Sequence, residues 1–223
     1  MSVVTCILIH CPKSRGGPVF ADSPERYALS FTSGGLLLRE ATVLAPFYRV
    51  ERDWNDVRKI AVERNVLQAR TYSSSVRVIR ETVQRLSVLT DAELNLLADA
   101  GPSEQQILMW AAACRRYRLI AEFAEEVVRE RFLLMTPSLS TDEFDRFLVG
   151  KSLWHPELDE LKPSTSMKLR QNMFRMLQDA GLLTESGSIV PAVMSERVIE
   201  ALNGRSPSDI RFFPTTISAG AER

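Results

Sequence analysis

The segment "ILMWAAAC", residues 107–114, constrains the fold most strongly because it is apolar on every side of a helix. A helix without a polar face belongs in the centre of a bundle. The surrounding pattern predicts one unbroken helix from Glu104 to about Leu134, roughly 45 Å long. With 223 residues and 45% hydrophobic content the chain can bury such a core, so we expect a mostly α-helical protein.

Helix-start signals recur along the chain and support that expectation. In a capping box, a Ser or Thr and a Glu or Gln three residues later satisfy each other's backbone N–H groups. A further start is predicted at Asp53, before "WNDVRKIAVERN". The predicted boxes pair Thr90 with Glu93, Ser103 with Gln106, and Ser140 with Glu143.

Changes in composition predict four regions. Residues 1–26 are rich in Pro, Gly and Ser, which is typical of a poorly ordered extension. A helical pattern begins at Tyr27, and Pro137 interrupts it, so we place a helical bundle at 27–136. A smaller domain occupies 137–203, and a Pro- and Gly-containing tail occupies 204–223.

The smaller domain has the element order of a winged helix-turn-helix. Helices are predicted at 141–151 and 164–180, followed by extended pieces around "LLT" and "SIV" that "ESGS" joins. Another helix follows at about 195–202. Helix, helix and short hairpin in this order favour a winged-helix-like domain after the bundle.

Charge and cysteine content exclude several classes. The chain carries 28 basic and 28 acidic residues, so a nucleic-acid site must come from a local patch. Its three cysteines form no disulfide framework, and no apolar stretch approaches the roughly 18–20 residues of a membrane helix. We therefore expect a soluble, cytoplasmic protein without membrane association.

Catalytic and metal-binding motifs are absent from the sequence. It contains no phosphate-binding or nucleophile-elbow motif, and the carboxylates of Asp142, Glu143 and Asp145 fit the start of a helix, where acids favour the helix dipole. His155 is interpreted as a loop residue packed at a domain edge. We predict no enzyme and no cofactor. We also predict no metal site, because a structural zinc needs four ligands and the cluster Cys6, His10 and Cys11 offers three.

The stretch from Asn65 to Arg80 contains three arginines and no acid. If a helix begins after its serines, one face is apolar, Arg77 points away from that face and Arg80 flanks it. Serine hydroxyls beside free N–H groups at a helix start suit a phosphate. A capped helix with a solvated basic face is the alternative. The apolar face consists of Val76, Ile79, Val83 and Leu86.

A second basic stretch, "CRRYR" at 114–118, is partly compensated, because Arg118 faces Glu122 four residues later. Arg115 and Arg116 have no acid three or four residues away and stay candidates.

The helix predicted at 164–180 separates an apolar stripe from a basic and amide face. No acid lies between Lys162 and Gln178, and Lys, Arg, Gln and Asn reach bases or phosphates from a major-groove helix. The wing carries Glu185 and no base, so a merely soluble face remains open. Across all stretches the predicted DNA-binding residues are Arg70, Ser74, Arg77, Arg80, Arg115, Arg116, Lys168, Gln171, Asn172 and Arg175.

Four blocks of sequence resemble the BrxA family, the small component of BREX bacteriophage-exclusion systems. The blocks are "YALSFTSGGLLLREA", "LQARTYSSSVRVIRETVQRL", "CRRYRLIAEFAEEVVRERFL" and "WHPELDELKPSTSMKLRQNMFRMLQDAGLL". The resemblance implies a non-catalytic, mostly helical protein that binds double-stranded DNA. Such a protein works beside the system's methyltransferase, ATPase and phosphatase-like component. The family's description as an inner-membrane protein conflicts with this sequence, and its likeness to an antitermination factor keeps RNA binding open.

Three hypotheses follow. The first is weakly specific binding of duplex DNA through the residues above. The second is a protein–protein scaffold for other BREX components. The third is a transcriptional regulator of its own operon, which predicts strong preference for one promoter sequence.

Overall fold

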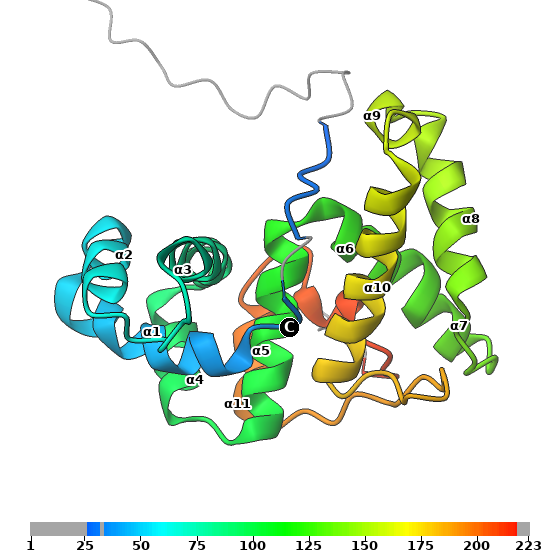
Figure 1. The fold of residues 1–223 in the computed structure, drawn as a ribbon. Coiled ribbons are helices and arrows are strands. Elements are labelled where there is room, and N and C mark those ends of the chain that lie inside the picture. The colour runs from blue at the N-terminus through cyan, green and yellow to red at the C-terminus, as the bar shows by residue number, and fades with distance from the viewer. Residues whose placement is uncertain (1–25, 32–33, 218–223) are drawn as a thin grey trace, which may run out of the picture.

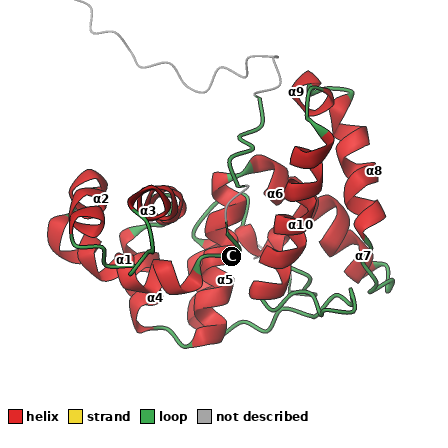
Figure 2. Cartoon of the chain, in the orientation of Figure 1, coloured by secondary structure: helices red, strands yellow, loops and turns green. Residues whose placement is uncertain are grey.

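The computed structural model describes residues 26–31 and 34–217 and is mostly helical, which confirms the predicted class (Figures 1 and 2). Of the predicted extension at residues 1–26, residues 1–25 lie outside the described part. The elements are α1 (Leu38–Glu51), α2 (Trp54–Glu63), α3 (Tyr72–Leu86), α4 (Asp91–Asp99), α5 (Pro102–Arg116), α6 (Arg118–Phe123), the π-helix η1 (Ala124–Arg129), α7 (Glu130–Leu133), α8 (Thr141–Ser152), α9 (Pro156–Asp159), α10 (Pro163–Asp179), α11 (Glu196–Asn203) and the 3-10 helix η2 (Asp209–Phe212).

Helix α5 is central, as the sequence predicts. All eight residues from Ile107 to Cys114 are buried. In Figure 1, α1–α4 lie to the left of α5 and α6–α10 to its right. Helices α1, α3, α4, α10 and α11 all pack against it. The apolar segment is therefore the shared core of both halves of the molecule.

The predicted single helix from Glu104 to Leu134 is wrong. Tyr117 has extended backbone angles, φ −124° and ψ 101°, and separates α5 from α6. Its hydroxyl donates a 2.5 Å hydrogen bond to the buried Glu81, and its ring lies 5.3 Å from that of Phe31. Burial of this side chain against distant segments accompanies the break, and helical periodicity cannot report such contacts.

Two of the three predicted capping boxes are present in the structure, and one is wrong. The boxes at Thr90 and Ser140 are present. The box predicted at Ser103 is wrong, since α5 begins at Pro102, two residues before the predicted start at Glu104, and the fixed φ of proline suits a first helical position. Its Glu104 accepts the Gly101 N–H instead, at 3.2 Å.

Residues 27–31 and 34–37 precede the first helix rather than belonging to one. Gly34 and Leu37 have left-handed backbone, with φ of 75° and 61°, so the chain turns sharply before α1. Tyr27 anchors the start of this segment, donating from its N–H to Glu157 at 2.7 Å and from its hydroxyl to Glu122 at 2.6 Å.

The second half contains α8, α9 and α10, and a short hairpin follows α10. Among the described residues the only bridges are Leu183 with Ile189 and Ser138 with Ser188, both antiparallel. Gly187 forms the turn with φ 83°. A minimal hairpin thus follows the predicted helix pair, and the winged-helix assignment stays a prediction.

The part of the predicted tail from Asp209 to Thr215 packs into the body, so the prediction is wrong there, whereas residues 204–207 are exposed. Ile210 and Phe213 are fully buried, and the Trp110 indole donates a 2.9 Å hydrogen bond to the Phe212 carbonyl. The chain returns to α5 after α11, because the apolar residues of "IRFF" supply core side chains despite the loop-like composition around them.

Candidate nucleic-acid interface

Helix α3 has the predicted two faces. Ile79, Val83 and Leu86 are buried, whereas Arg77 and Arg80 are exposed. Arg70 is also exposed, just before the helix. Within the described residues these three arginines form no ion pair, so their charges are open to a ligand's phosphates. 

The helix begins at Tyr72, earlier than expected, and its cap is Thr71 rather than one of the serines. The Ser74 N–H donates to the Thr71 hydroxyl at 3.2 Å, and the Ser74 side chain is half-buried. That donor is therefore already occupied within the helix cap.

Helix α10 also has the predicted buried apolar stripe and exposed polar face. Its buried stripe is Leu169, Met173, Met176 and Leu177. Lys168, Gln171 and Arg175 are exposed. Asn172 is half-buried, and its amide donates a 3.0 Å hydrogen bond to the Phe31 carbonyl, so part of its donor capacity is used inside the protein.

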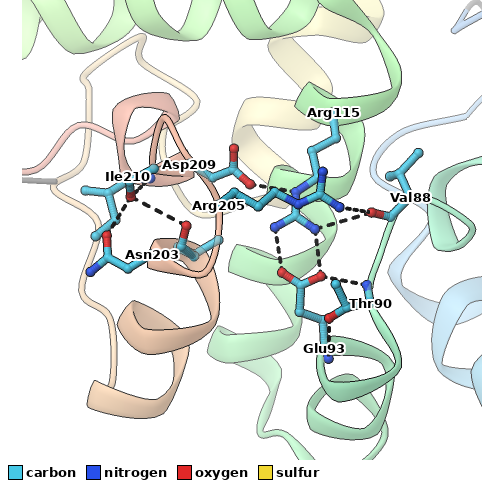
Figure 3. Close-up of polar contacts among 10 residues, drawn as sticks. Val88, Thr90, Glu93, Arg115, Asn203, Arg205, Asp209 and Ile210 are labelled. Carbon is cyan, nitrogen blue, oxygen red and sulfur yellow. Dashed lines mark hydrogen bonds and ion pairs between the residues drawn. The ribbon is translucent and has the colours of Figure 1, made fainter. Parts of the chain in front are cut away.

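Arg115 is not part of an open surface, in contrast to its predicted role. Its side chain is 5% exposed and forms two hydrogen bonds with Glu93, at 2.7 and 2.5 Å. Its Nε donates to Asp209 at 2.6 Å. Figure 3 shows Arg115 and Arg205 both directed at the Val88 carbonyl. These acids lie far from Arg115 in sequence, which is why helical spacing did not reveal them.

The pKa shifts of Glu93 and Arg115 both favour the charged forms of the pair. Burial by itself would raise the pKa of Glu93, but hydrogen bonds from Arg115 and the Thr90 N–H outweigh it and hold the pKa below its ordinary value. Burial would likewise lower the pKa of Arg115, and its carboxylate partners raise it instead. The Arg115 guanidinium is thus the charge partner of two buried carboxylates, those of Glu93 and Asp209.

Arg116 is half-buried, and its guanidinium lies 5.2 Å from the centre of the Tyr117 ring. Its DNA contact stays a prediction. The Arg118–Glu122 pair is confirmed, with a 2.5 Å hydrogen bond.

His155 packs as expected. It is 4% exposed, its ring lies 4.0 Å from that of Tyr27, and its Nδ1 is 3.3 Å from Glu157 Oε1. In the part of the chain that the structure describes, no three His, Cys, Asp or Glu side chains gather as a metal site. Cys6, His10 and Cys11 lie outside that part. No described helix combines the length and apolar character needed to cross a membrane.

Sequence patterns did not predict the polar contacts of Arg85, Glu81 and Asp179, which lie on the same two helices, α3 and α10, as the exposed basic side chains. Arg85 is fully buried and pairs with Glu81 at 3.0 Å, four residues earlier. Asp179, at the end of α10, accepts the Leu36 N–H at 2.8 Å. The spacing of Glu81 and Arg85 was a usable signal, but it indicates an ordinary surface pair and not a buried one.

Comparison with solved structures identifies the fold. A crystal structure of an uncharacterized protein from Magnetospirillum magneticum aligns with a TM-score of 0.71. It is 23% identical, and the match covers 83% of this chain and 97% of that one. The overall helical fold is therefore shared with another protein.

The family model of BrxA matches residues 25–206, and the chain belongs to this family. Two curated relatives are each named "BREX protein BrxA". The one from Escherichia coli O9:H4 (strain HS) is 23% identical over 186 residues, covering 77% of this chain and 87% of that protein. The one from Paramagnetospirillum magneticum is 26% identical over 162 residues, covering 72% and 81%.

Proposed function

We propose that this chain is a non-catalytic component of a BREX phage-defence system that binds double-stranded DNA with weak sequence specificity. The BREX assignment follows from the names of its relatives, and we expect the system's methyltransferase and ATPase to act beside it. One observation carries the DNA assignment: two helices each expose cationic side chains that form no ion pair with the described residues.

The two faces suit different tasks. Helix α10 offers Lys168, Gln171 and Arg175 from a single exposed face, as a winged-helix recognition helix does in the major groove. Arg77 and Arg80 of α3 are suited to phosphates, which are bound without reading the sequence. The hairpin after α10 carries Glu185 and no base, so we expect it to contribute little to phosphate binding.

A gel-shift series with several unrelated duplexes tests the proposal. We expect similar affinity for all of them. The triple variant Arg77→Ala, Arg80→Ala and Lys168→Ala should remain folded by circular dichroism and lose binding. Strong preference for one promoter duplex would favour the regulator hypothesis, and preference for RNA over every DNA duplex would contradict the proposal.

A second candidate function, a scaffold for other BREX proteins, is favoured by an exposed apolar patch at the end of α8. Val149, Leu153 and Trp154 are 69%, 79% and 72% exposed there. Exposed tryptophan is typical of protein–protein contacts. The patch predicts that Trp154→Ala weakens co-elution with a BREX partner while DNA affinity stays unchanged. Absence of any complex between the purified components would exclude this function.

A further inference from the structure

One peptide group, between Gly35 and Leu36, is held from both sides by the helices that carry the two basic faces. Its carbonyl accepts a 2.9 Å hydrogen bond from Arg85 Nη1 of α3. Its N–H donates a 2.8 Å hydrogen bond to Asp179 Oδ2 of α10. Because a peptide group is planar and rigid, it joins the two helices as a short fixed link.

The α3 end of this link is locked by buried groups. Arg85 is fully buried, and its Nε and Nη2 both donate to Glu81, at 3.1 and 3.0 Å. Tyr117 donates to the same Glu81 oxygen at 2.5 Å. Burial, followed by this hydrogen bond, raises the pKa of Tyr117 to about 12, so the hydroxyl keeps its proton at physiological pH. The Arg85 guanidinium has no freedom to swing away.

At the α10 end, the hydrogen bond to Asp179 requires the carboxylate to lie very close to Gly35. A Cβ at position 35 would lie 1.9 Å from Asp179 Oδ2, so only glycine lets the carboxylate reach the Leu36 N–H. A second tie runs from Asn172 to the Phe31 carbonyl at 3.0 Å.

Near Gly35, helices α3 and α10 are connected through this peptide group and not mainly by packing against each other. Val78 of α3 and Arg175 of α10 line one hollow, together with Gly34 and Gly35. Each helix packs separately against α5. At this point the linking peptide group therefore adds a direct polar connection between two helices that are otherwise joined through α5.

We infer that the link Arg85–Gly35–Leu36–Asp179 is a positioning device that fixes the α3 and α10 faces for simultaneous contact with one duplex. The inference rests on the proposed DNA binding. Two faces held on a rigid body gain from effective concentration, which commonly raises affinity by about 10²–10⁴ over one face alone. Asp179 and Arg85 act through this spacing and need not touch DNA.

The variant Asp179→Ala tests the link, because it removes the acceptor from a half-buried position at a helix C-terminus, where loss of a negative charge is tolerated. We expect it to fold, to lose about tenfold or more in affinity for a duplex of about 30 base pairs, and to keep its affinity for one of about 8 base pairs. Its salt dependence on the long duplex should become shallower. The conservative variant Asp179→Asn, which retains an acceptor oxygen, should restore both.

A distance measurement tests the same link without DNA. Spin labels at Ser73→Cys in α3 and Ser164→Cys in α10, with Cys6 and Cys11 replaced by serine, should give one narrow distance distribution. Asp179→Ala should broaden it, and Asp179→Asn should not. Gly35→Ala, which inserts a methyl group between the partners, should broaden it as well.

The outcomes separate the two proposals. Folded Asp179→Ala and Gly35→Ala variants that keep a narrow distribution and wild-type duplex-length dependence would overturn the inference. Absence of DNA binding by the wild type would instead overturn the proposed function, and the label distances would still decide whether the link fixes the helices.

Discussion

Two arginine-rich stretches look alike in sequence and differ in how far acidic side chains compensate their charge in the folded protein. In residues 70–80, the three arginines are exposed and form no ion pair with the described residues. In residues 114–118, Arg115 is buried between Glu93 and Asp209, and Arg118 pairs with Glu122. A run of basic residues thus indicates a ligand site only when acids distant in sequence leave it uncompensated.

The largest effect expected from this difference is on stability. Arg115→Ala leaves Glu93 and Asp209 buried without their cation, and breaking a buried pair costs about 3–5 kcal/mol. Urea unfolding should show a loss in free energy of this size. Arg116→Ala, one residue away and half-buried, is the matched control and should cost about 1 kcal/mol or less. Equal small losses in both variants would contradict the structural role of Arg115.

The next effect concerns DNA and not stability. The double variant Arg77→Ala and Arg80→Ala should flatten the log–log salt slope of binding by about two, because each phosphate contact contributes about 0.9. Its unfolding free energy should stay within about 0.5 kcal/mol of the wild type. The control variant Arg49→Ala and Arg64→Ala removes the same charge from exposed positions outside the proposed faces. A similar slope change in the control would mean that net charge, and not these positions, drives binding.

A smaller effect should appear in the pH dependence of stability. The folded-state pKa of Glu93 lies below its ordinary value of 4.5, so its contribution is complete above about pH 4.5 and is lost as the pH falls through the folded pKa. Unfolding free energy measured from pH 6 to pH 3 should therefore fall more steeply in the wild type than in Glu93→Gln. Parallel curves would show that Glu93 does not contribute in this way.

The smallest expected effect is that of Arg116→Ala on the salt dependence of DNA binding. Since its guanidinium lies against the Tyr117 ring, Arg116→Ala should change the salt slope by clearly less than the roughly 0.9 of a full phosphate contact. A full change would place the 114–118 stretch on the DNA surface together with residues 70–80.

Local patterns predicted the elements well and the long-range contacts poorly. The buried segment of α5, the apolar faces of α3 and α10 and two capping boxes all follow from spacing within one helix. The break at Tyr117 and the burial of Ile210, Phe212 and Phe213 depend on partners far along the chain, and periodicity does not record these.

The candidate site shows the same division. Exposure of Arg77 and Lys168 follows from their places opposite apolar faces, and Arg80 is exposed at the flank of its face. The pairing of Arg115 does not, since Glu93 and Asp209 lie 22 and 94 residues away. Nor does the role of Gly35, which becomes apparent only from its approach to Asp179.

A salt titration of wild-type binding to two unrelated duplexes of equal length is the most direct test of DNA binding by the exposed faces of α3 and α10. With Arg70, Arg77, Arg80, Lys168 and Arg175 contacting phosphates, the log–log slope should lie near minus four to minus five for both duplexes. A slope near zero, or binding to neither duplex at low salt, would contradict the assignment of these exposed faces to DNA.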